Sequence, residues 1–273
     1  KNKRYIFLPV INNKANNDLN RIFNIDLNGE IITSPKIEVS LDKKNRIIKI
    51  TQLDPDSWIL FKDLKLTNWD IRFFGRKYNF DENIKKGQRF NRFGITGCLN
   101  FFRTEFDKSS IQMNNGGCED SVNIIGSTGI IEKINVHNAK ADAIDLDFSD
   151  LKIKNLYVNS AGNDCFDVSG GIYSVTNGNL AYCNDKGLSI GESSIFTMDN
   201  ISINKSLIGI SVKDFSEAKF IKSNITNSKI CIEAKQKKQE FGGAYVKVGE
   251  LFCDASSNNL DNNSIISFKK YEL

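Results

Sequence analysis

Five aspartates and two lysines in the middle of the chain have the residue types and the spacing of an acid–base site. Ionisable residues recur at intervals of 22 positions, so equivalent places in consecutive repeats carry charge. A fixed period of this length is typical of a solenoid, in which equivalent side chains stack in columns about 4.8 Å apart. Carboxylates at that distance repel each other, which raises the pKa of at least one. The seven residues are Asp142, Asp145, Asp147, Asp164, Asp167, Lys186 and Lys213.

A carboxyl group with a raised pKa can act as a general acid near neutral pH, and closely spaced carboxylates can also hold calcium. Calcium is therefore a possible cofactor, and no other is indicated. The candidate catalytic residues are Asp142, Asp164, Asp167, Lys186 and Lys213. The candidate substrate-binding residues are Asp145, Asn163, Ser189, Ser211 and Lys235. The candidate calcium ligands are Asp145, Asp147 and Asp167.

A six-residue motif opens each repeat and predicts a β-strand. Its copies begin at residues 120, 142, 164, 186, 208 and 230 and read DSVNII, DAIDLD, DCFDVS, KGLSIG, IGISVK and ICIEAK. The third and fifth positions are apolar, as in a strand with one buried face, and we expect the second, fourth and sixth to point outward. Apolar alternation returns later in each repeat and predicts a second sheet, at Ile134 and Val136, Leu156 and Val158, Leu180 and Tyr182, and Ile201 and Ile203.

These patterns predict an all-β fold, a parallel β-helix of coils of about 22 residues, right-handed by the usual chirality of parallel crossovers. We assign residues 46–253 to the β-helix, with Leu99 and Phe101 in the interior of an earlier coil. Residues 1–45, with strand-like runs at 5–10 and 37–41, would form a cap or the remnant of a preceding domain. Residues 254–273 would form an irregular, capping end.

The composition narrows the choice of partners and compartment. The chain has 37 basic and 33 acidic residues in 273, too small an excess of positive charge to indicate nucleic acid. The sequence contains no run of 18 apolar residues, which is the length that a membrane-spanning helix requires. The sequence indicates neither the oligomeric state nor whether the chain is part of a larger one.

The six cysteines fall into pairs separated by about one coil. Their even number and regular spacing favour disulfides over free buried thiols, and hence a secreted, periplasmic or cell-surface protein. Each disulfide would bridge adjacent coils. The pairs are Cys98 with Cys118, Cys165 with Cys183, and Cys231 with Cys253.

Four segments resemble the central motifs of polygalacturonases, which are secreted right-handed parallel β-helix enzymes that cleave pectin by inverting hydrolysis. The segments are DAIDLD at 142, GNDCFDVSGG at 162, CNDKGLSIGE at 183 and GISVK at 209. The resemblance covers residues 140 to 213. It matches Asp142, Asp164 and Lys213 to three of that family's functional residues, and the pair Cys165 and Cys183 to one of its disulfides.

Three positions depart from the family pattern. Asn163 stands where the family has its proton-donating aspartate, Lys186 replaces its histidine and Ser211 its arginine. An amide cannot protonate a leaving group, so the resemblance implies the fold and a polysaccharide ligand rather than pectin hydrolysis itself.

Two functions therefore remain open. One is a polysaccharide-processing enzyme of the hydrolase, lyase or epimerase type that acts on an acidic polysaccharide. In the lyase variant, calcium would acidify a sugar proton and Lys186 or Lys213 would abstract it. The other is a non-catalytic polysaccharide-binding, adhesin or spike module. Convergence of the charged residues around a groove would favour the enzyme, and a flat, paired arrangement would favour the module.

Overall fold

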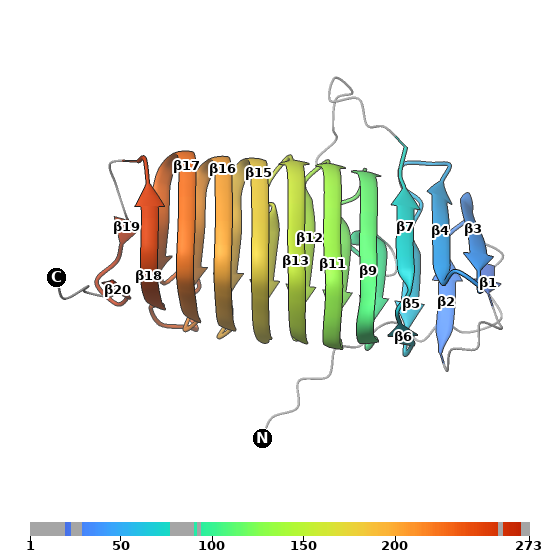
Figure 1. Cartoon of the computed structure of the whole chain (residues 1–273), viewed down its shortest axis with the longest axis horizontal. Coiled ribbons are helices and arrows are strands. Elements are labelled where there is room, and N and C mark those ends of the chain that lie inside the picture. Colours follow the sequence, from blue (N-terminus) through green and yellow to red (C-terminus); the bar gives the residue numbers. More distant parts are fainter. Residues whose placement is uncertain (1–19, 23–28, 77–89, 92–93, 256–258, 269–273) are drawn as a thin grey trace.

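The computed structural model describes residues 20–22, 29–76, 90–91, 94–255 and 259–268. These residues form a β-solenoid of about nine coils of about 22 residues each, which confirms the parallel β-helix. Figure 1 shows the strands lying side by side along the long axis, from β1 (Asn20–Ile22), β2 and β3 at one end to β19 and β20 at the other.

Each coil contributes strands to two faces of the solenoid. The first face contains the motif strands, and its members are β2 (Glu30–Thr33), β5 (Ile59–Lys62), β8 (Gly97–Phe102), β10 (Asp120–Ile125), β12 (Asp142–Asp147), β14 (Phe166–Ser169) and β19 (Asn259–Leu260). The second face contains β3 (Ile37–Asp42), β4 (Ile47–Gln52), β6 (Lys65–Thr67), β7 (Asp70–Phe74), β9 (Glu105–Gly116), β11 (Thr128–Ala139), β13 (Asp150–Ala161), β18 (Tyr245–Cys253) and β20 (Ile265–Phe268). Three long strands contribute to both faces: β15 (Ile172–Gly191), β16 (Ile195–Lys213) and β17 (Glu217–Lys235).

The interior ladder holds the coils together. Successive motif strands pair in parallel, with Val122 opposite Ile144 and Ile124 opposite Leu146, so apolar residues stack on apolar residues. All twelve side chains at the third and fifth positions are fully buried, from Val122 to Ala234. Complete burial of one large apolar side chain contributes about 1.5 to 3 kcal/mol, so this column is a large share of the core energy. The predicted ladder is confirmed.

The second motif position was expected to point outward and is instead buried. Ser121, Ala143 and Cys165 have no exposed surface. At Gly187 an added Cβ would lie 2.7 Å from the side chain of Ile203, which belongs to the second-face part of β16. The chain turns between the two faces here, so this position faces inward and accepts only small side chains.

Tyr182 was expected to pack inside the second sheet and is instead exposed. Leu156 and Val158 pair with Gly178 and Leu180 in the next coil, so the interior pair lies two residues earlier than predicted. Tyr182 follows at a corner with φ of 60°, and 48% of it is exposed. Gly178 lacks a side chain at the interior position, and Met198 Cε reaches into the space.

Hairpin pairing occurs at one end of the solenoid and extra parallel pairing at the other. β3 pairs antiparallel with β4, and parallel stacking on the second face begins where β4 meets β7. β19 and β20 pair in parallel with β17 and β18, so regular pairing continues past residue 253, where an irregular end was expected. The strand-like run at 5–10 lies outside the described residues; the run at 37–41 is β3.

Three disulfides link the predicted partners: Cys98 with Cys118, Cys165 with Cys183, and Cys231 with Cys253. Their Cα–Cα distances are 5.4, 5.4 and 6.1 Å, within the normal range. Within the described ranges no helix is long and apolar enough to cross a membrane.

Replacing an interior leucine by alanine should destabilise the solenoid far more than replacing an exposed one. Leu188 is fully buried in the ladder, whereas 40% of Leu207 is exposed. We expect Leu188→Ala to lower the free energy of unfolding by about 2–5 kcal/mol because it leaves a cavity. Leu207→Ala should change it by less than about 1 kcal/mol. Urea unfolding followed by circular dichroism measures both, and equal losses would contradict the assignment of the ladder.

Candidate functional site

A column of polar side chains runs along the first face, at the fourth position of every motif, and five of the eight members that the structure describes are buried although we expected this position to point outward. Parallel register places Asn123 opposite Asp145, and Asp145 opposite Asp167. The remaining members of the column are Asn100, Ser189, Ser211, Glu233 and Asn259. Asp145 and Asp167 are therefore neighbouring carboxylates about one strand spacing, ~4.8 Å, apart. Both are partly exposed, so a ligand on this face could reach them.

The aspartates at the first motif position are buried instead. Asp142 and Asp164 are each 4% exposed. Oδ1 of Asp142 accepts hydrogen bonds from the backbone N–H of Asp164, at 2.8 Å, and from the side-chain amide of Asn163, at 2.7 Å. Oδ1 of Asp164 accepts from the backbone N–H of Lys186 at 2.9 Å. These two carboxylates bind the backbone of the next coil, which leaves them little access to a ligand.

Lys186 lies above Asp164 and is bound to two carboxylates. Its Nζ lies 3.4 Å from Oδ1 of Asp164 and also contacts Asp185. The facing carboxylates raise the pKa of Lys186 despite its burial. Because the ammonium form is stabilised, Lys186 does not suit the role of proton-abstracting base that we considered for it.

Lys213 behaves in the opposite way. It is 6% exposed, and its Nζ donates to Oγ of Ser189 at 2.7 Å. Burial lowers the pKa of Lys213, and the nearby Lys237 and Lys186 act in the same direction. Of the two lysines, only Lys213 is shifted toward the neutral form that a base requires.

Asp147 occupies the sixth motif position and is partly exposed. Burial raises its pKa to about 6, and the carboxylates of Asp167 and Glu192 add to the effect. Burial and Asp147 together hold the pKa of Asp145 well above its usual range. The raised pKa values agree in direction with the repulsion predicted from the spacing.

Burial also raises the pKa of Asp164 to about 7 and that of Asp142 above its ordinary value. For Asp164 the ammonium of Lys186 opposes the shift without cancelling it. In Asp167, one carboxylate oxygen is buried and has no hydrogen-bond partner. Such an atom has a cost in free energy, and a ligand that donates to it would relieve that cost.

The other predicted substrate-binding residues already have partners within the protein. Ser211 donates to Oε1 of Glu233 at 2.8 Å, and Nζ of Lys235 lies 2.8 Å from the same atom. Asn163 is occupied by Asp142. These contacts keep the three residues within the protein, and the more accessible acids of this face are Asp145, Asp147 and Asp167, which are partly exposed.

The structure does not assemble the expected calcium site. In the part of the chain that it describes, no three His, Cys, Asp or Glu side chains are arranged to hold a metal ion. Asp145 and Asp147 are alternate residues of one strand, about 6.6 Å apart along it, and their carboxylates stand side by side. Calcium binds six to eight oxygens, and calcium binding by Asp145, Asp147 and Asp167 stays a prediction.

Several residues that shape this face were not predicted. Asp185 binds Lys186, Glu233 binds Ser211 and Lys235, and Glu192 lies near Asp147. Asp185 and Glu192 stand next to the motif, and the corner position after it reads Gly126, Phe148, Gly170 and Glu192. Alternating glycines there signal a left-handed backbone, and the non-glycine members could have been recognised as unusual.

Comparison of the chain with protein families, curated proteins and solved structures finds no match.

Asparagine in place of Asp120 should stabilise the protein at alkaline pH but not at acidic pH. Asp120 is 1% exposed, one of its oxygens has no partner, and burial raises its pKa to about 7. A carboxyl whose pKa is raised by folding contributes stability below pH 4, and this contribution is lost as the pH rises through 7. Asp120→Asn removes the carboxyl that titrates, so the variant does not lose this stability as the pH rises.

Urea midpoints at pH 4, 6 and 8 test this expectation. The gain of Asp120→Asn over wild type should grow from pH 4 to pH 8. Asp150→Asn, at an exposed position of β13, should show no such trend. A pH-independent gain for Asp120→Asn would contradict the raised pKa.

Proposed function

We propose that this β-helix processes an acidic polysaccharide bound across the outer side of the first face. The observation that carries the proposal is the partly exposed set Asp145, Asp147 and Asp167, with the buried Lys213 near Asp167. A polysaccharide lies readily along a solenoid, because its sugar units and the coils both repeat along one axis.

In this proposal Asp147 is the proton donor. With a pKa of about 6, a useful fraction of its carboxyl stays protonated at neutral pH, as a general acid requires. Asp167, one coil further on, supplies the second carboxylate of a glycosidase pair. We therefore assign the catalytic roles to acids that a substrate can contact, and not to Asp142 and Asp164, which bind the backbone.

Lys213 gives the lyase or epimerase variant its base. Burial lowers its pKa, which makes the neutral amine more accessible than in an ordinary lysine, and its contact with Ser189 orients Nζ. Beyond it, Lys235 and Lys238 provide positive charge for the carboxylates of an acidic polymer, although both are also paired with glutamates. Hydrolysis and elimination leave different products, so one assay can distinguish them.

A non-catalytic polysaccharide-binding module is the second candidate. It is favoured by Asp142 and Asp164, which are buried in contacts with the backbone of the next coil, and by the partly buried Lys186, which pairs with Asp164 instead of lining an open groove. In that case the outer acids and lysines would bind a polymer without changing it.

Activity should depend on Asp147 and Asp167. Purified protein is incubated with polygalacturonate, alginate and hyaluronate, with and without calcium, while reducing ends and the absorbance of unsaturated uronates are followed. We expect Asp147→Asn and Asp167→Ala to lower the rate by at least about 100-fold. The wild-type rate should fall above pH 6 as Asp147 loses its proton.

Asp150→Ala, on the second face, is the matched control and should keep the wild-type rate. Asp164→Ala is a poor test, because it would leave Lys186 partly buried beside a lost partner and destabilise the fold. Equal background rates for wild type and Asp167→Ala on every substrate would rule out the enzyme. Retention of the polymer in affinity electrophoresis would then support the binding module.

A further inference from the structure

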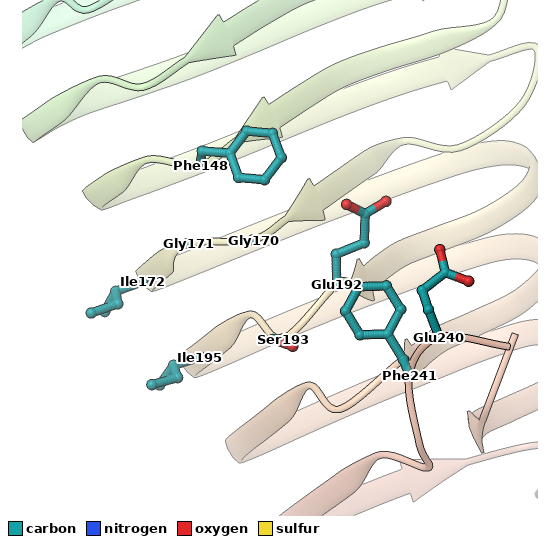
Figure 2. Close-up of a pocket in the computed structure, with 9 residues that line it drawn as sticks. All are labelled: Phe148, Gly170, Gly171, Ile172, Glu192, Ser193, Ile195, Glu240 and Phe241. Carbon is teal, nitrogen blue, oxygen red and sulfur yellow. The ribbon is translucent and has the colours of Figure 1, made fainter. Parts of the chain in front are cut away.

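A groove of about 490 Å³ lies at the corner where the motif strands end. It is lined by Phe148, Gly170, Gly171, Ile172, Glu192, Ser193, Ile195, Glu240 and Phe241. Phe148 follows Asp147 directly, so the groove adjoins the acidic face. In Figure 2 the bare backbone of Gly170 and Gly171 separates Phe148 from Phe241, and the carboxylates of Glu192 and Glu240 point the same way.

Phe148 is an exposed aromatic residue held in an unfavourable backbone conformation. Its φ is 49°, in the left-handed region, and 47% of it is exposed. The equivalent corner positions one coil before and one coil after are Gly126 and Gly170, with φ of 58° and 62°. Glycine adopts this conformation without strain, whereas a bulky side chain does not. A bulky residue that is held in a strained conformation and leaves about half of its ring exposed is typical of a binding site.

Phe241 is held on the other side of the groove by a well-anchored loop. Oδ1 of Asp214 accepts the backbone N–H groups of Lys237 and Lys238 at 2.7 and 2.8 Å. The side chain of Gln236 donates to the carbonyl oxygen of Phe241, and the ring of Phe215 packs edge-on against Phe241 at 6.2 Å. The groove is therefore built before any ligand binds, which lowers the entropy cost of binding.

The charge of the groove selects its ligand. Two of its lining residues, Glu192 and Glu240, are acidic, and none is basic. Lys238 pairs with Glu192 from outside the lining. Carboxylates accept hydrogen bonds from sugar hydroxyls and repel uronate or sulfate groups, while the aromatic faces can stack on the apolar side of a pyranose ring.

We propose that this groove is a subsite for an uncharged pyranose residue of the bound polysaccharide. This inference rests on the proposed function. It adds that the polysaccharide is a heteropolymer, which contains both acidic and uncharged sugar units. An acidic sugar unit of the polymer would lie near Lys213, and a neutral sugar unit would lie in the groove. A polymer of uronate units alone would therefore fill only part of the site.

Substitutions in the groove test the subsite. Titration calorimetry and saturation-transfer NMR are carried out with uncharged gluco-, galacto- and manno-oligosaccharides, cationic chitosan oligosaccharides and anionic oligogalacturonates. We expect an uncharged oligosaccharide to bind, and Phe148→Gly and Phe241→Ala each to weaken it about tenfold. Phe252→Ala is the control: 61% of Phe252 is exposed, on β18, and it does not line the groove.

Phe148→Gly has a second readout that separates function from folding. Because glycine suits the left-handed corner, we expect its urea midpoint to equal or exceed that of wild type while binding is lost. Uncharged oligosaccharides that fail to bind, or bind equally to wild type and both groove variants, would overturn the subsite. Binding of chitosan oligosaccharides alone would also overturn it, in favour of a cation site.

The groove and the proposed function can fail separately. Binding of an uncharged oligosaccharide that depends on Phe148, in a protein that processes no polysaccharide, would keep the subsite and reject the enzyme. Processing that depends on Asp167 but is unchanged in Phe148→Gly and Phe241→Ala would keep the enzyme and reject the subsite.

Discussion

The stacking of apolar side chains in register is the constraint on which the rest of the structure depends. Each coil alone has too little buried surface to be stable, and it gains a core only by placing its third and fifth motif residues on those of its neighbours. That register then dictates every other column. Side chains on the outside stand about one strand spacing apart whether or not their charges suit each other.

The register places carboxylates close together and partly out of water, which costs free energy, and contacts within the fold reduce that cost. Asp142 and Asp164 are buried, but each accepts the backbone N–H of the residue one coil later. Asp164 also has the ammonium of Lys186 beside it. Burial raises the pKa of Asp142, Asp145, Asp147 and Asp164 in spite of these contacts, and the neighbouring carboxylates add to the effect. Charge that the fold leaves poorly satisfied is the part most available for a ligand.

The corner beyond these strands shows the same separation of stability from function. Gly126 and Gly170 occupy left-handed positions that suit glycine, whereas Phe148 occupies the position between them and exposes its ring. Stability alone would favour glycine in all three coils. The phenyl ring instead forms one side of a groove whose other side, at Phe241, is fixed by the loop that Asp214 holds.

The period of 22, the apolar alternation and the cysteine spacing were sufficient to determine the solenoid, its interior ladder and its three disulfides, because each depends on local pattern repeated in register. The sequence also placed the acids on shared columns and predicted the direction of their pKa shifts. Only the tertiary structure decided which acids face solvent: Asp120, Asp142 and Asp164 of the first position and Glu233 of the fourth are buried, whereas Asp145, Asp147 and Asp167 are partly exposed. It also decided that Tyr182 points outward, and that Phe148 and Phe241, 93 residues apart in the chain, line one groove. Such contacts depend on the corner geometry and on a loop anchored from another coil, and a residue-by-residue pattern does not encode either of them.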